Sequence, residues 1–260
     1  MDKELRERRL LQHELRFAIG DNQLRLIYQP QARTTGKIIG FEALVRWQHP
    51  QRGLIDADVF VPSAEGSGLV MQLGEWVLRE ACREAATWNQ DLQIAANLSP
   101  AQFKHGDLPA LVHSVLQKTG LSPDRLELEI TEGVLIGDLP KAVSILHNLK
   151  ALGVKIVLDD FGTGFSSLSY LHVFPFDKIK IDRNFIAQLD DNPRAPTIIR
   201  TIIDLAHGLS IPAVAEGVET EEQLAFLEQE GCDEIQGYFT GRPKRIDDYA
   251  EIVGKAARLA

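Results

Sequence analysis

The residues of this chain that can do acid, base or metal chemistry stand near the ends of short apolar segments. Eight such segments each end close to an acid, an amide or a lysine, in the order Gln29, Glu42, Asn97, Glu129, Asp159 with Asp160, Lys180, Glu216 and Gln236. In a barrel of parallel strands these ends meet on one face, where the loops build an active site. A single strand-end carboxylate would more often cap the next helix, but a polar residue at every end favours one common site.

Five of these residues are carboxylates, and together they repel one another unless cations bind between them. We therefore expect a metal site of oxygen ligands, which suits Mg²⁺ or Mn²⁺, with Ca²⁺ as an inhibitory binder. The seven histidines form neither HxH nor HExxH, and the two cysteines, Cys82 and Cys232, are far apart in the sequence. Soft or borderline metal ligation and a disulfide framework are thereby disfavoured, and a reducing cytoplasm fits.

Asp159 and Asp160 are adjacent and precede a segment rich in Gly, Ser and Thr. Adjacent strand residues normally point to opposite faces, but at a strand terminus both carboxylates can turn toward one site. Two metal ions could then share one of them, roughly 3.5 to 4 Å apart, an arrangement that activates water for in-line phosphoryl displacement. An ordinary connection between a strand and a helix is the alternative for this segment.

Lys180 admits three roles. Barrels host Schiff-base lysines, but several nearby carboxylates should raise the pKa of this lysine and disfavour the neutral amine that such chemistry needs. A charged role beside water or phosphate is favoured. A lysine that only forms ion pairs at the end of the barrel is the third alternative.

The elements that must position these residues are alternating strands and helices. The apolar segments predict strands at Leu24–Gln29, Ile38–Val45, Leu92–Asn97, Leu126–Ile130, Val154–Leu158, Lys178–Ile181, Ile211–Ala215 and Glu234–Gln236. The clearest helical patterns cover Leu73–Trp88, Leu108–Thr119, Leu139–Leu152, Pro196–Leu209 and Glu221–Glu230. Eight strands at this length predict an α/β fold of the (β/α)8 TIM type, with an open doubly wound sheet as the rival. Only a short turn, Ala32 to Lys37, separates the first two strands, so we expect a hairpin and an antiparallel first strand.

Composition narrows the function classes. The chain has 260 residues, 44% of them hydrophobic, and 28 basic against 37 acidic residues give 28 − 37 = −9. This charge argues against a broad grip on DNA or on an anionic membrane, and neither a membrane span nor a signal-peptide core is visible. Residues 1–20 form an amphipathic lead-in helix that either packs on its own domain or ends a connector from an upstream domain. Residues 21–260 show no linker and are expected to form one domain.

Eight segments in this order resemble the EAL domain family, the bacterial phosphodiesterases of the second messenger cyclic di-GMP. They are Tyr28-Gln29-Pro30, Glu42-Ala43-Leu44-Val45-Arg46, Asn97-Leu98-Ser99, Glu129-Ile130-Thr131-Glu132, Asp159-Asp160-Phe161-Gly162-Thr163-Gly164, Lys178-Ile179-Lys180-Ile181-Asp182 and Glu216-Gly217-Val218-Glu219, with Gln236-Gly237-Tyr238 closing the series. The resemblance runs from about Leu24 to Pro243 and implies a (β/α)8 barrel with an antiparallel first strand. It also implies a cytoplasmic domain that forms a homodimer and follows a sensory or diguanylate-cyclase domain in a larger signalling protein.

The resemblance implies a role for each matching residue. One Mg²⁺ or Mn²⁺ would be held by Glu42, Asn97, Glu129 and Asp159, and a second by Asp159, Asp160 and Glu216. Lys180 would contact the attacking water or a phosphate oxygen, and the general base stays open among Lys180, Asp160 and Glu216. Substrate would be bound by Gln29, Leu44, Arg46 and Gln236, and the loop after the metal ligands would be anchored by Glu132 and Glu219. A surface ion pair is the alternative for Arg46, and a helix N-terminal carboxylate is the alternative for Glu132.

The implied reaction is metal-dependent hydrolysis of cyclic di-GMP to linear 5′-pGpG, with a catalytically weak cyclic di-GMP receptor or a signalling scaffold as the alternatives. The chain departs from the family pattern at Gln31, where an apolar residue commonly follows Gln-Pro, and at Gly133, where a small hydroxyl residue is frequent. Neither departure removes a metal ligand. We therefore expect Gln31→Ile to leave turnover nearly unchanged, and Gly133 to affect loop regulation rather than hydrolysis.

Overall fold

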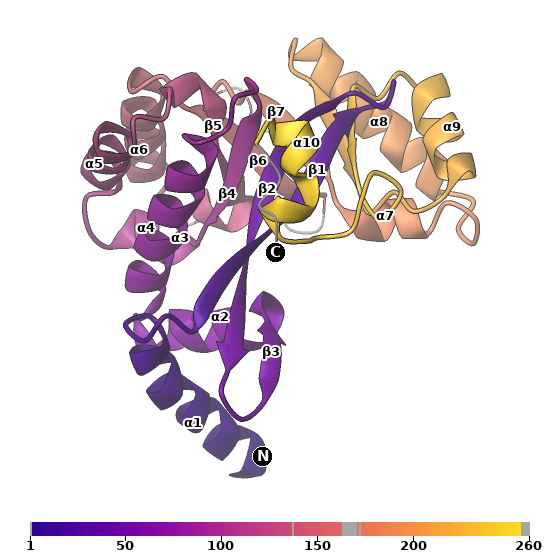
Figure 1. Ribbon diagram of the computed structural model, residues 1–260. Helices are drawn as coiled ribbons and strands as arrows, with labels where there is room; N and C mark the ends of the chain where they lie inside the picture. The colour runs from indigo at the N-terminus through magenta and orange to yellow at the C-terminus, as the bar shows by residue number, and fades with distance from the viewer. Residues whose placement is uncertain (1, 137, 163–170, 172, 256–260) are drawn as a thin grey trace.

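The architecture is that of a barrel with an extended two-stranded ribbon (Figure 1). This computed structural model describes residues 2–136, 138–162, 171 and 173–255. In Figure 1 the strands of the barrel stand between helices α5 and α6 on one side and α8 and α9 on the other. The first two strands continue below the barrel into a smaller lobe, where α1, α2 and β3 lie.

Eight strands close the barrel. They are β1 (Leu24–Arg33), β2 (Ile38–His49), β4 (Gln93–Leu98), β5 (Leu126–Thr131), β6 (Lys155–Phe161), β7 (Lys178–Ile181), β8 (Ala213–Glu216) and β9 (Glu234–Gln236). Their order is β1-β9-β8-β7-β6-β5-β4-β2, and β2 pairs again with β1. Strand β1 is antiparallel to both of its neighbours, and the other barrel strands run parallel. The predicted (β/α)8 TIM-type barrel with an antiparallel first strand is confirmed.

The helices cover the outside of the barrel. The five predicted ones are confirmed as α3 (Val70–Ala85), α5 (Leu108–Thr119), α6 (Leu139–Ala151), α8 (Ala195–Gly208) and α9 (Glu221–Gln229), joined by the shorter α4 (Pro100–Lys104), α7 (Arg183–Ala187) and α10 (Ala250–Val253). Helices α5 and α6 begin in the same way, because Asp107 and Asp138 each accept a hydrogen bond from a backbone N–H of the first turn, with Pro within that turn. This cap sets where each helix starts.

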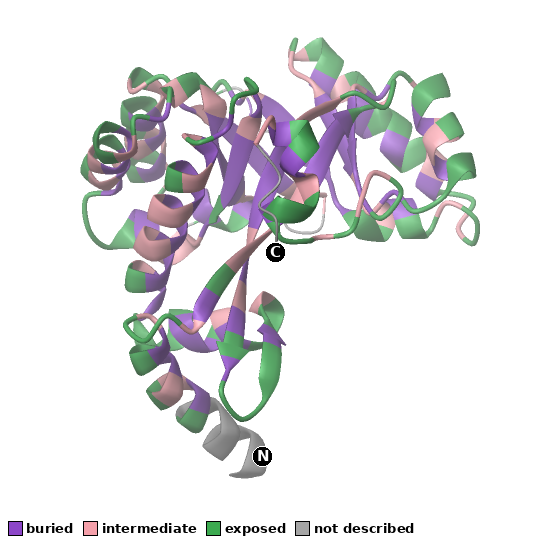
Figure 2. Cartoon of the chain, in the orientation of Figure 1, coloured by how far each residue is buried: buried purple, intermediate pink, exposed green. Residues whose placement is uncertain are grey.

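The main core fills the barrel and the space under its helices. In Figure 2 the parallel strands β4 to β9 are buried along most of their length, and the helices around them carry exposed residues on their outer faces. Fully buried apolar side chains of successive strands, such as Ile94, Leu128, Ile156 and Ile179, belong to one cluster. This pattern is that of parallel strands packed on both faces, and it holds the strand ends in fixed positions.

A second hydrophobic cluster lies where β1 and β2 leave the barrel. The two strands are ten and twelve residues long, and β2 pairs there with β3 (Gly53–Asp56). Trp47 of β2 packs edge-on against Phe60 of α2 (Ala57–Ser67), and Leu15 of α1 (Asp2–Ala18) is fully buried in the same cluster. The amphipathic half of α1 thus packs on the chain's own β2 and α2. The domain boundary at residue 20 stays a prediction.

The long ribbon corrects one expectation from the sequence. Gln29 and Glu42 do not stand at strand ends but face each other in the middle of β1 and β2. Strand β2 continues because Val45 and Trp47 are buried in the second cluster, and β1 continues past Gln29 because its last residues pair with β9. Among the described helices, none is long and apolar enough to span a bilayer.

Candidate active site

Lys180 lies at the centre of a cluster of carboxylates. It is the third residue of β7 and is 1% exposed. Its Nζ atom is 2.6 Å from Glu216, 2.9 Å from Glu129, 3.4 Å from Asp159 and 4.0 Å from Glu42. These residues come from β8, β5, β6 and β2, and the barrel brings them together at one face as the pattern predicts. We call Lys180 with these four carboxylates and Asp160 the acidic site.

Glu42 is held by two amides. Asn97 of β4 donates from Nδ2 to its Oε1 at 2.6 Å, and Gln236 of β9 donates from Nε2 to its Oε2 at 2.5 Å. Gln236 also donates to Oε1 of Gln29 at 3.2 Å. A ligating asparagine uses its Oδ1 atom, and the bond to Glu42 engages only the Nδ2 atom of Asn97.

Asp159 and Asp160 face the same site because the backbone is irregular between them. The register of β6 on β7 shifts between Leu158 and Phe161, and Asp160 has a φ of 53°. Asp tolerates this left-handed conformation, and it breaks the alternation that would send the two carboxylates to opposite faces. Single oxygen atoms of Asp159, Asp160 and Glu216 lie within 4.8 Å of one another.

Burial shifts the titration of these acids. It raises the pKa of Glu129 well above its ordinary value, because the attraction of Lys180 offsets only part of the cost of desolvation. In the same way burial raises the pKa of Glu216 to about 8 and that of Asp160 to about 6. For Glu42 burial also acts upward, but the charge of Lys180 and the two amide donors lower its pKa overall.

Lys180 is an ammonium at neutral pH. Burial alone would lower its pKa, but the surrounding carboxylates, with Asp159 the largest contributor, raise it well above the ordinary value. A neutral amine for Schiff-base chemistry is therefore disfavoured, as expected from the sequence. In the protein without metal, this ammonium neutralises part of the cluster.

The donor set fits a hard divalent cation. The three carboxylates whose oxygens converge are Asp159, Asp160 and Glu216, and all are oxygen donors. Glu129 adds a second observation, since its buried Oε2 atom has no hydrogen-bond partner among the residues that the structure describes. A buried carboxylate oxygen without a donor is costly unless a cation or a water meets it.

The residues expected to bind substrate lie on one face of β2 and beside it. Glu42, Leu44 and Arg46 alternate with Ala43 and Val45, whose side chains are buried on the other face. Along this row the residues change from buried Glu42 to half-buried Leu44 and Arg46. The Arg46 guanidinium forms an ion pair with Asp56 at 2.8 Å and donates to the Val45 carbonyl. The ion pair expected as the alternative role of Arg46 is therefore present, and a contact between Arg46 and a phosphate stays a prediction.

The two residues predicted to anchor the loop differ in position. Glu132 is buried, and its Oε1 accepts a hydrogen bond from the backbone N–H of Gly162 at 3.3 Å, at the end of β6. Glu219 is exposed beside the N-terminus of α9, where its backbone N–H donates to Gln223. Residues 163–170 of the predicted loop lie outside the described residues. Both anchoring roles stay predictions.

Two further residues belong to the acidic site. Gln31 is 3% exposed and donates to Glu129 and Gln236, and Asp182 is buried beside Asp160, whose pKa it helps to raise. Strand alternation was the signal for Gln31, because it is two residues from Gln29 and shares its face. Asp182 carried no separate signal in the sequence. It is the N-cap residue of α7, where it accepts a hydrogen bond from the backbone N–H of Asn184.

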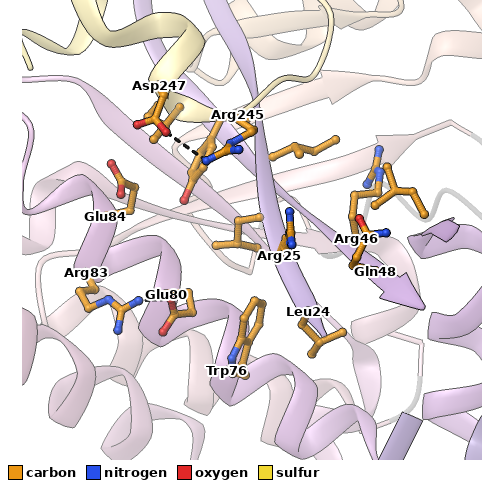
Figure 3. A pocket seen from close by; sticks show the side chains of 15 residues that line it. Leu24, Arg25, Arg46, Gln48, Trp76, Glu80, Arg83, Glu84, Arg245 and Asp247 are labelled. Atoms are coloured by element: carbon orange, nitrogen blue, oxygen red, sulfur yellow. Dashed lines mark hydrogen bonds and ion pairs between the residues drawn. The ribbon is translucent and has the colours of Figure 1, made fainter. Parts of the chain in front are cut away.

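A wide hollow lies apart from the acidic site. It has a volume of about 700 Å³ and lies between the outer part of β1 and β2, α3 and the segment around Arg245 (Figure 3). Its walls mix arginines with acids, and Arg46 is the one predicted site residue among them. The volume of this hollow alone would favour it as the candidate active site. The carboxylates, however, converge in the acidic site at the face of the barrel, and we take the acidic site as the candidate active site.

Comparison with known proteins shows the family of this chain. Residues 12–243 match the family model described as the EAL domain. The chain belongs to the EAL domain family. The match begins at residue 12, earlier than the expected Leu24, and so includes the half of α1 that packs on α2.

Named relatives of this EAL domain are longer proteins of Pseudomonas aeruginosa. It is 45% identical over 248 residues to the bifunctional diguanylate cyclase/cyclic di-GMP phosphodiesterase MucR, covering 94% of this chain and 36% of MucR. It is 42% identical to the cyclic di-GMP phosphodiesterase NbdA, covering 90% of this chain and 30% of NbdA. The chain thus spans about a third of the length of these curated relatives.

A solved structure extends the similarity to the fold. The PaMucR phosphodiesterase in its c-di-GMP complex superposes with a TM-score of 0.89 at 44% identity, covering 92% of this chain and 99% of that chain. That solved chain therefore has the fold described above.

Proposed function

We propose that this EAL domain is a phosphodiesterase that hydrolyses cyclic di-GMP to linear 5′-pGpG, with Mg²⁺ or Mn²⁺ as cofactor. The observation that carries the proposal is the complete acidic site, in which Glu42, Glu129, Asp159 and Glu216 surround Lys180 within 4.0 Å. The names of MucR and NbdA, and the c-di-GMP complex of PaMucR, support the choice of substrate. A receptor without turnover has no need for so many buried charges in one place.

The carboxylates and Asn97 would hold two ions, with Asp159 shared between the two ligand sets. Divalent cations bound there supply Lewis acidity to the phosphate and lower the pKa of water toward neutrality. They also let an acidic protein accept a dianionic dinucleotide. The single oxygens of Asp159, Asp160 and Glu216 within 4.8 Å of one another support this assignment.

The protein side chains orient the reactants. The Lys180 ammonium would donate to the attacking water or to a phosphate oxygen, and its raised pKa disfavours it as the base. Asp160 and Glu216 are then the two carboxylates left to receive the proton of the water. Gln29, Gln236, Leu44 and Arg46 would hold the dinucleotide along β2, so that the 3′-oxygen leaves opposite the attacking water.

We propose further that the domain acts in the cytoplasm as a homodimer and as part of a longer signalling protein. The support for a longer protein is that the chain spans about a third of the length of its relatives, one of which is named as a bifunctional cyclase and phosphodiesterase. The homodimer and the cytoplasmic location rest on the family resemblance. Sedimentation of the purified chain with and without cyclic di-GMP tests the dimer.

The test is chromatographic detection of pGpG after incubation with cyclic di-GMP and Mg²⁺ or Mn²⁺, with EDTA and Ca²⁺ as inhibited controls. We expect Glu42→Gln to abolish turnover, because the variant keeps the shape of the side chain and loses the charge. Glu127→Gln is the matched control, since Glu127 is also a buried barrel acid but pairs with Lys178 at 2.9 Å, away from the site. Turnover by Glu42→Gln at the wild-type rate would refute the metal assignment, and metal-independent binding without product would favour the receptor.

A further inference from the structure

We propose that Gln31 is a positioning residue of the acidic site, which fixes the amide of Gln236 and the carboxylate of Glu129. The proposal deepens the proposed function and rests on it for the meaning of the site. It concerns a residue that lies on β1, the antiparallel strand, and that contacts residues on β9 and β5.

The side chain of Gln31 extends into the barrel and uses both of its N–H donors there. Its Nε2 atom donates to Oε1 of Gln236 at 3.1 Å and to Oε1 of Glu129 at 3.4 Å. The residue is 3% exposed, so water does not compete freely for these contacts. An amide carries two N–H donors, and this geometry directs both to the acidic site.

The contacts define which way the Gln236 amide points. Its Nε2 atom faces two oxygens, Oε2 of Glu42 at 2.5 Å and Oε1 of Gln29 at 3.2 Å. Its Oε1 atom must then face a donor, and Gln31 supplies it. A flipped Gln236 would set its oxygen against two acceptors and its nitrogen against the Gln31 donor, so the four side chains allow only one arrangement.

Gln31 therefore links the two sides of the acidic site. Through Gln236 it reaches Glu42, and directly it reaches Glu129, whose Oε1 atom also lies 2.9 Å from Lys180. Partners that orient a ligating carboxylate in this way tune the affinity for metal. The Oε1 atom of Gln31 is itself buried and has no hydrogen-bond partner among the described residues.

This geometry revises the expectation that Gln31→Ile leaves turnover nearly unchanged. That expectation rested on residue 31 not being a metal ligand, and it did not include the two donor contacts. An apolar side chain leaves Oε1 of Gln236 without its donor in a position where Gln236 is 3% exposed. The amide and the Glu129 carboxylate are then free to rotate away from the geometry that binds metal.

The decisive variant is Gln31→Met, which keeps the length of the side chain and removes both donors. The matched control is Gln93→Met, because Gln93 is an amide of the same barrel whose Oε1 accepts from Lys178 at 3.1 Å, away from the acidic site. Titration calorimetry measures Mn²⁺ affinity without substrate, and cyclic di-GMP affinity in EDTA repeats the comparison without metal. Gln31→Leu, which also lacks both donors and adds no charge, is the second variant should Gln31→Met not fold.

We expect both variants at position 31 to bind Mn²⁺ about 10- to 100-fold more weakly, the usual effect of losing an outer partner of a metal ligand. Gln93→Met should bind Mn²⁺ and nucleotide like the wild type. If the position 31 variants bind Mn²⁺ and cyclic di-GMP with wild-type affinity, the proposal is overturned. It is also overturned if the loss of affinity in every variant, including Gln93→Met, is proportional to the fall in its melting temperature. If the wild type binds Mn²⁺ but does not cleave cyclic di-GMP, the proposed function is refuted. The comparison of Mn²⁺ affinity between the wild type and the position 31 variants still tests the role of Gln31 in that case.

Discussion

Replacing Lys180 with Met tests whether its ammonium is the internal cation of the acidic site. The Nζ atom lies within 4.0 Å of Glu42, Glu129, Asp159 and Glu216, and the substitution leaves these buried acids without their counter-charge. Removing one partner of a buried ion pair costs about 3–5 kcal/mol. We expect Lys180→Met to destabilise the protein in EDTA by about that amount.

Metal should replace part of the lost charge. A ligand present at 100 times its dissociation constant stabilises the folded state by about 2.7 kcal/mol. Because Lys180→Met has no competing ammonium in the acidic site, Mn²⁺ should bind it more tightly and stabilise it by more than it stabilises the wild type. The stability difference between variant and wild type should therefore be smaller in Mn²⁺ than in EDTA.

The matched control is Lys178→Met on the same strand. Lys178 is a buried ammonium 2.7 Å from Glu234 and 2.9 Å from Glu127, and these residues lie at the opposite ends of the strands. We expect a similar loss of stability in EDTA, but no greater gain from Mn²⁺ than in the wild type. Urea unfolding followed by circular dichroism measures each case. Equal gains from Mn²⁺ in the two variants, or a loss below about 1 kcal/mol for Lys180→Met, would refute the reasoning.

Three further predictions concern pH and the loop. In EDTA the pKa of Glu216 is raised from an ordinary 4.5 to about 8, so the folded state binds the proton of this carboxyl more tightly than the unfolded state does. The stabilisation that results from this proton is complete below pH 4.5 and is lost as the pH rises to about 8. Urea unfolding across that range should show the decline, and saturating Mn²⁺ should flatten it. Glu132→Ala should lower Mn²⁺ affinity and turnover, because Gly162 loses its acceptor, and unchanged calorimetry would contradict the anchoring role. Gly133→Ala should stabilise the protein by about 0.4–1 kcal/mol, since an added Cβ meets Thr131 Oγ1 at an ordinary 3.5 Å; a lower urea midpoint would show that the site is strained.

The fold was predictable where the pattern is local. The apolar strand segments and the caps at Asp107 and Asp138 signal their elements within a few residues, and the barrel order follows from their alternation with helices. Strand β3 and helix α2 gave no such signal. They form because Trp47 packs on Phe60, two residues from different elements, and a periodicity within one segment carries no information about that contact.

The sequence by itself determined which chemistry the protein can do. Apart from Gln29 and Glu42, the acids, the amides and Lys180 lie near the ends of strands that local apolar patterns predict, and oxygen ligands in that number call for hard cations. It also indicated the antiparallel first strand, through the short turn before Ile38.

Only the tertiary structure decided how these groups meet. The left-handed backbone at Asp160 turns two adjacent carboxylates to one side, and the closure of β1 against β9 brings Gln31 to Gln236. Such contacts join residues that are far apart in the chain, and each depends on side-chain length, register and burial together. Residue type and strand alternation place Gln31 on the same face as Gln29, but they give neither the register nor the burial, so they do not say which groups Gln31 contacts.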